Sequence, residues 1–154
     1  MARKASDEVC LENYGKLCEK FRENVPESSR FEIVYGCGVD VGMMDFGVLR
    51  KTTYSYSSYA IGFDAAENEI AVLPVTPDLS ECGKPFYLKR DSIMKAKQSF
   101  FSKEITIRAN SLPKKYIQFV VQEQINQDPD GVVLLVKQNE AAKRFAEFFK
   151  GYGK

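Results

Sequence analysis

The chain has 154 residues, of which 44% are hydrophobic and 28% charged, a composition typical of a globular domain. Its 22 basic and 21 acidic residues leave a net charge of +1, so the overall charge does not indicate a nucleic-acid partner. The sequence has no histidine, which excludes Ser/His and Cys/His catalysis and histidine metal sites.

The N-terminal segment, the apolar runs and the cysteines bear on the cellular compartment of the protein. No segment near the N-terminus resembles a signal peptide, and the longest apolar run, residues 132–136, is far shorter than the about 20 residues of a membrane span. The four cysteines, Cys10, Cys18, Cys37 and Cys82, include no CxxC pair. We therefore expect a cytoplasmic protein with free thiols, without a metal or another cofactor; the alternative is an all-cysteine metal site assembled in three dimensions.

The first predicted element is an amphipathic helix over residues 6–24, capped at its start by Ser6. Its apolar residues recur at spacings of three and four on one stripe: Cys10, Leu11, Tyr14, Leu17, Cys18 and Phe21. Pro26 ends the helix. We divide the chain into this helix with its linker, residues 1–29, and a main domain, residues 30–154.

From residue 30 the pattern changes to the two-residue alternation of β-strands. The predicted strands cover residues 31–35, 47–64, 69–75, 86–88, 92–98, 105–109 and 116–122. Residues 132–136 are apolar throughout, so they fit either a buried strand or a buried helix.

A final helix is predicted over residues 140–150, with Asn139 as its N-cap and Gly151 as its C-terminal cap. Its apolar stripe contains Ala142, Phe145, Phe148 and Phe149, and we expect the phenylalanines to be core residues. The whole order predicts an α+β fold that is mainly β: an antiparallel barrel or sandwich flanked by two helices.

Several segments resemble the strands and closing helix of bacterial pleckstrin-homology-like and GRAM domains. They are Tyr59-Ala-Ile-Gly-Phe-Asp64 with Glu69-Ile-Ala-Val-Leu73, Phe86-Tyr-Leu-Lys-Arg-Asp-Ser-Ile93, the hairpin from Ile105 to Phe119, and Asn139 to Phe149. The likeness covers roughly residues 30–150. It implies a partly open antiparallel β-barrel whose C-terminal helix plugs one end. It also implies a largely non-enzymatic family that binds phosphoinositides, proteins or peptides.

Two features differ from that family pattern. The N-terminal helix is an addition, which would pack on the barrel or on a second copy. The first strand-to-strand loop, residues 36–47, carries Asp40 and Asp45 but no basic residue, whereas phosphoinositide-binding members usually carry Lys and Arg there. This loop therefore disfavours recognition of an inositol phosphate.

Other motifs have ordinary structural explanations. The glycines at 36, 38 and 42 have GxGxxxG spacing and precede no helix, so they do not form a dinucleotide loop. The pairs Asp40/Asp45 and Asp128/Asp130 could act in acid–base chemistry, but Asp is common in such turns. Tyr54 and Tyr56 lie on the strand face opposite Ile61, where the first helix would cover them; the alternative is a protein-binding patch.

The charge distribution gives the candidate binding surface. Residues 84–115 contain nine basic and only two acidic residues. Strand alternation predicts that Lys89, Lys95, Lys97 and Arg108 converge on the outside of the second sheet, next to a turn with Phe100, Phe101 and Lys103. Two simpler explanations remain: a solvated sheet face, and phenylalanines that fold back to cap the barrel.

The sequence therefore predicts a non-catalytic binding module whose partner is a protein or an anionic membrane surface. The alternatives are a small-molecule-binding β-barrel and, less favoured, an enzyme of unknown type. A specific nucleic-acid partner is not expected, and the oligomeric state is not predicted.

Overall fold

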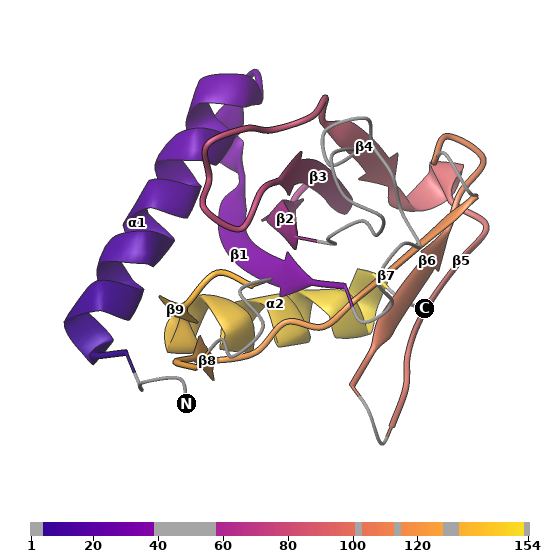
Figure 1. Ribbon diagram of the computed structural model, residues 1–154. Helices are drawn as coiled ribbons and strands as arrows, with labels where there is room; N and C mark the ends of the chain where they lie inside the picture. Colours follow the sequence, from indigo (N-terminus) through magenta and orange to yellow (C-terminus); the bar gives the residue numbers. More distant parts are fainter. Residues whose placement is uncertain (1–4, 39–57, 101–102, 113–114, 128–132, 153–154) are drawn as a thin grey trace, which may run out of the picture.

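The computed structural model describes residues 5–38, 58–100, 103–112, 115–127 and 133–152 (Figure 1). They form an α+β fold with the elements α1 (Asp7–Asn24), η1 (Ser28–Arg30), β1 (Glu32–Cys37), β2 (Ser58–Asp64), β3 (Glu69–Val75), β4 (Phe86–Lys89), η2 (Arg90–Ser92), β5 (Lys95–Gln98), β6 (Ile105–Arg108), β7 (Tyr116–Phe119), β8 (Gln124–Ile125), β9 (Val136–Lys137) and α2 (Asn139–Tyr152). Residues 39–57, which include Asp40, Asp45, Tyr54 and Tyr56, lie outside the described residues, as do Asp128 and Asp130.

The described strands form three antiparallel sheets. One has the order β1-β2-β3-β4, the second β5-β6-β7, and the third pairs β8 with β9. Each of the two larger sheets is a simple meander, because sequential strands are neighbours. Within the described residues they do not close into one barrel. They are joined where Cys37 at the end of β1 exchanges two backbone hydrogen bonds with Val120, at 2.9 and 2.8 Å.

Helix α1 forms where the sequence predicts it. The Ser6 hydroxyl accepts a hydrogen bond from the Val9 amide at 3.2 Å, which is the expected N-cap. Four residues of the predicted stripe are buried: Cys10, Leu17, Cys18 and Phe21. The prediction for Leu11 was wrong, since it is 52% exposed. Leu11 lies at the margin of the stripe, where α1 borders α2 rather than a sheet.

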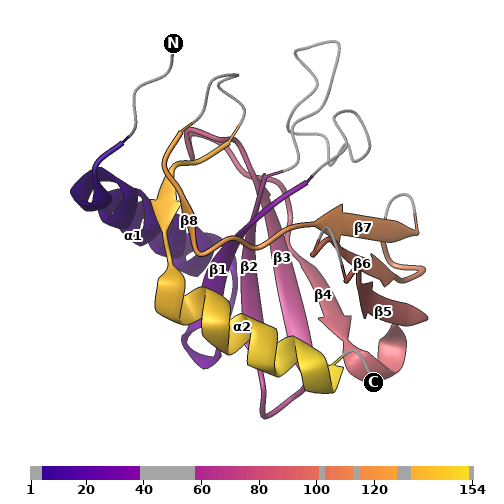
Figure 2. The ribbon, with the colours of Figure 1, turned by 90° about the horizontal axis from the view of Figure 1, so that it is seen from below.

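The middle of the four-stranded sheet is buried on both faces, and every residue of β2 is buried. Helix α1 covers one face, and α2 together with the three-stranded sheet covers the other (Figure 2). Small residues of β2 admit α1: a Cβ atom at Gly62 would lie only 2.4 Å from the Phe21 ring. The helix therefore packs on the face opposite Ile61, as predicted.

The core between the two larger sheets is closed by α2. Phe145 is 2% exposed and its ring lies 5.3 Å from the Phe63 ring in an edge-to-face arrangement. Phe149 is also buried, as predicted, whereas Phe148 is only partly buried and packs against the side of this core. Burial of these rings holds α2 across the open side of the sheet.

Both predicted ends of α2 were wrong. At the start, the Gln138 carbonyl accepts from the Ala142 amide at 2.8 Å, and Asn139 is the first helical residue. The Asn139 side chain donates to Glu123 instead of capping the helix. At the other end, the helix continues through Gly151 to the fully buried Tyr152, whose hydroxyl donates to the Leu88 carbonyl at 2.7 Å. This burial outweighs the about 1 kcal/mol that a helical glycine costs.

The structure also decides the predictions for residues 132–136 and for residues 92–98. Of residues 132–136, Val136 begins the short strand β9, residues 133–135 form neither helix nor strand, and Val132 lies outside the described residues. The strand predicted over residues 92–98 is shorter, because the 3-10 turn η2 occupies its first residue and β5 begins at Lys95. This turn moves the chain from one large sheet to the other.

The outer edge of β1 is closed by side chains as well as by backbone. Gln138 is 3% exposed; its Oε1 accepts from the Tyr35 amide at 2.7 Å and its Nε2 donates to the Tyr35 carbonyl at 3.1 Å. The Tyr14 hydroxyl of α1 donates to the Ile33 carbonyl at 2.5 Å. Together with Val120 beside Cys37, these groups occupy an edge that would otherwise be open to another strand.

Candidate functional site

The outer face of the three-stranded sheet carries the predicted cluster of basic residues. The register pairs Lys95 with Arg108 and Lys97 with Thr106, while Ala96 pairs with Ile107 in the core. Alternating residues of a strand point to opposite faces, so Lys95, Lys97 and Arg108 share the outer face, as predicted. We call this surface, made by these three residues, the basic face.

Polar and aromatic neighbours surround the basic face. The Arg108 guanidinium lies 5.5 Å from the centre of the Tyr116 ring, its cross-strand partner. Gln118 donates to Thr106 and to Glu104, each at 3.2 Å. Among the described residues, no ion pair involves Lys95, Lys97 or Arg108. In the described part of the chain, these three positive charges therefore face solvent without an ion-paired carboxylate.

The hairpin of β5 and β6, which carries the basic face, projects from the body of the molecule (Figure 1). Phe100, which follows β5, is 80% exposed, so it does not fold back to cap the core. The Lys103 amine lies 5.3 Å from the centre of its ring. Phe101 lies outside the described residues. The described part of the tip thus combines an exposed aromatic ring with a cation.

Lys89 does not join the basic face, and this part of the prediction was wrong. It ends β4 in the four-stranded sheet, where its amine lies 3.3 Å from the Glu67 carboxylate. The prediction required β4 and β5 to be strands of the same sheet, but they belong to different sheets. The turn η2 between them separates their outer faces.

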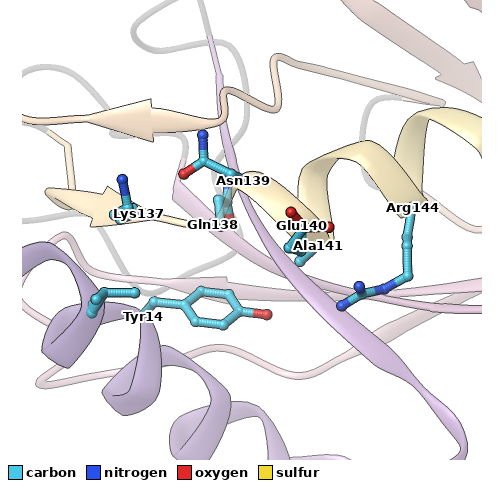
Figure 3. A pocket seen from close by; sticks show the side chains of 8 residues that line it. Tyr14, Lys137, Gln138, Asn139, Glu140, Ala141 and Arg144 are labelled. Carbon is cyan, nitrogen blue, oxygen red and sulfur yellow. The ribbon is translucent and has the colours of Figure 1, made fainter. Parts of the chain in front are cut away.

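A groove of about 410 Å³ lies between α1 and the start of α2 (Figure 3). We call it the helix groove; it is lined by Leu11, Tyr14, Lys137, Gln138, Asn139, Glu140, Ala141 and Arg144. Figure 3 shows the Tyr14 and Arg144 side chains reaching toward β1 from the two helices. Sequence reasoning missed this groove because its walls are more than 100 residues apart in the chain. No signal for it was present in the sequence, because Leu11 fitted the apolar stripe of α1 and only the structure shows that this residue is exposed.

A smaller hollow of about 260 Å³ adjoins the helix groove, with Tyr14 and Arg144 in both linings. We call it the Ile33 hollow; its lining is Tyr14, Cys18, Arg22, Phe31, Glu32, Ile33 and Arg144. Arg144 forms an ion pair with Glu32 across it. Burial raises the pKa of Tyr14, so its hydroxyl stays protonated and keeps donating to the Ile33 carbonyl.

The cysteines are all free thiols, as predicted. Burial raises the pKa of both Cys10 and Cys18, which keeps these two as thiols rather than nucleophilic thiolates. Among the described residues, no three His, Cys, Asp or Glu side chains gather as a metal site would require.

Comparison with protein-family models, with curated proteins and with solved structures gave no match to this chain. In the part of the chain that the structure describes, neither helix has both the length and the apolar character needed to cross a membrane.

Proposed function

We propose that the chain is a non-catalytic binding module that docks on an anionic membrane surface through the basic face and the adjoining hairpin tip. The proposal includes a pleckstrin-homology-like architecture. Its support is the order of a four-stranded meander, a three-stranded meander and a closing helix. The backbone pairing of Cys37 with Val120 supports a partly open barrel made from the two sheets.

The observation that carries the proposal is the grouping of Lys95, Lys97 and Arg108 on one face beside the exposed Phe100 ring. A basic residue near an anionic leaflet contributes about 1 kcal/mol of attraction. An aromatic side chain at the same level can enter the headgroup region, which a purely electrostatic contact does not require. The basic face would take the role that the first strand-to-strand loop has in phosphoinositide-binding members of the family, because the loop here, residues 36–47, has no basic residue. The module would work in the cytoplasm, where the inner leaflet is negatively charged.

Vesicle co-sedimentation at low salt tests the proposal. We expect the wild-type chain to sediment with vesicles containing phosphatidylserine and to remain in solution with phosphatidylcholine alone. The paired change Lys95→Glu and Lys97→Glu should weaken binding by more than about thirtyfold, because two attractive charges of about 1 kcal/mol each become repulsive. The matched control is Lys16→Glu with Lys143→Glu, which makes the same charge change at exposed positions on α1 and α2.

Phe100→Ala separates insertion from simple charge attraction. We expect it to weaken binding to anionic vesicles while leaving the salt dependence unchanged, because no charge is removed. Equal recovery with neutral and anionic vesicles, or an equal loss in the control pair, would refute the membrane proposal. Two explanations of the basic face would then be left. One is an acidic protein partner, and the other is a sheet face that is only solvated.

A further inference from the structure

The outer edge of β1 keeps one backbone donor without a partner among the described residues. Cys37 pairs outward with Val120, and Tyr35 pairs outward with Gln138, so alternate residues of β1 direct their polar groups away from β2. Ile33 belongs to the same set, and its carbonyl accepts from Tyr14 on that side. The Ile33 amide therefore faces the side of β1 on which the Ile33 hollow lies, and no residue that the structure describes accepts from it there.

The surroundings of this amide select the chemistry of a ligand. The Ile33 carbonyl is already occupied, so the strand offers only a donor at this point. Arg22 and Arg144 line the same hollow, and Glu32 is the single carboxylate among its described lining residues, whose net charge is therefore positive. Two guanidinium groups and a buried amide favour an acceptor with negative charge, and a planar carboxylate matches the fork of an arginine.

The helix groove extends the hollow with apolar surface. Leu11, the Tyr14 ring and Ala141 lie along it, and Leu11 exposes more than half of its side chain there. We propose that the Ile33 hollow and the helix groove together bind a small carboxylic acid with a short apolar body. Its carboxylate would accept from the Ile33 amide and from Arg144, and its apolar part would lie against Leu11 and Ala141. This inference is independent of the basic face.

Because of Glu32, the proposal predicts that two charge removals change the ligand affinity in opposite directions. In the structure it pairs with Arg144, so it competes with a ligand carboxylate for the same guanidinium. Removing the Glu32 charge should strengthen binding, whereas removing the Arg144 charge should weaken it. A purely structural ion pair would not give opposite effects. Both side chains are about half exposed, at 48% and 55%, so neither change should unfold the chain.

The test is a titration with hexanoate, followed by the backbone amide signals in two-dimensional NMR. We expect saturable binding with a large shift of the Ile33 amide, and little response to hexanol, which has the same apolar body without the charge. Arg144→Gln should weaken the affinity about tenfold, as for a lost charged hydrogen bond. Glu32→Gln should tighten it about threefold. Lys150→Gln, also on α2, is the control and should leave the affinity unchanged.

N-acetyl-leucine distinguishes the source of the carboxylate, since it carries the terminus of a peptide. Tighter binding of N-acetyl-leucine than of hexanoate would assign the site to peptide C-termini, and the reverse would assign it to free acids. The proposal is overturned if hexanoate leaves the Ile33 amide unmoved, if hexanol binds equally well, or if Arg144→Gln and Glu32→Gln change the affinity in the same direction.

Discussion

Replacing Gln138 with alanine should destabilise the chain far more than an ordinary glutamine change. Its amide makes three hydrogen bonds: two with the Tyr35 backbone, at 2.7 and 3.1 Å, and one to the Gln122 carbonyl at 2.8 Å. The Gln138→Ala change leaves the two buried Tyr35 groups and the Gln122 carbonyl without this partner. Each orphaned group costs about 1–3 kcal/mol, so the expected loss is about 3 kcal/mol or more. That is a large part of the roughly 5–15 kcal/mol that stabilises a typical domain.

Urea unfolding followed by circular dichroism measures this loss. The matched control is Gln124→Ala, because the Gln124 side chain donates to Asp7 at 2.8 Å through a hydrogen bond that is exposed. We expect a loss below about 0.5 kcal/mol for the control, as for most surface changes. In a thermal scan the Gln138→Ala change should lower Tm by about 6–12 °C. If the two variants differ by less than about 1 kcal/mol, the Gln138 amide does not close the edge of β1 energetically, and the reasoning fails.

The Gln138→Glu change tests the same contact through pH. The introduced carboxyl can still accept from the Tyr35 amide, but in its charged form it faces the Tyr35 and Gln122 carbonyl oxygens. Its folded pKa should therefore lie above the roughly 4.3 of an exposed glutamate. Because the folded state then binds the proton more tightly, this variant should regain stability as the pH falls through that raised pKa. A variant whose deficit relative to wild type is the same at pH 4 and pH 8 would contradict the assignment.

Three further predictions concern the core, the thiols and acid stability. Phe145→Ala should cost about 3–5 kcal/mol, measured by urea unfolding, and an unchanged midpoint would show that α2 does not dock. Adding reductant should alter neither the unfolding midpoint nor the sedimentation coefficient, because all four cysteines are free; a lowered midpoint would reveal a disulfide. Burial alone would raise the pKa of Asp64, but hydrogen bonds from Arg30 and from the Glu67 and Ala66 amides outweigh it and lower the pKa. The stability from this carboxylate is complete above about pH 4, its unfolded value, and is lost as the pH falls through the lowered folded value. Asp64→Asn should therefore flatten the acid-induced loss, and an unchanged acid profile would rule out this contribution.

The sequence predicted those elements whose pattern is local. Ser6 with the apolar stripe identified α1, and the alternation at residues 105–109 and 116–122 identified the β6–β7 hairpin. The same alternation placed Lys95, Lys97 and Arg108 on one face, because cross-strand neighbours in a tight hairpin follow from register alone.

Features that depend on distant segments were not predictable in this way. The end of α2 depends on Tyr152 finding the Leu88 carbonyl, which lies 64 residues earlier in the chain. Lys89 was misplaced because no pattern near it shows that the chain changes sheets at η2. The helix groove and the Ile33 hollow combine α1, β1 and α2, and only the three-dimensional arrangement brings Tyr14, Ile33 and Arg144 together.

Completion of both cores by the same late segment has a consequence for synthesis on the ribosome. Leu134 and Val136 fill the core under α1, Gln138 closes the edge of β1, and the phenylalanines of α2 seal the core between the sheets. A growing chain can assemble α1 and the strand meanders early, but the β1 edge lacks Gln138 and both cores stay incomplete until residues 134–152 have emerged. Unpaired strand edges and exposed apolar surface are what chaperones recognise and what aggregates. The interval between translation of β7 and release of α2 is therefore when this protein is most exposed to misassembly.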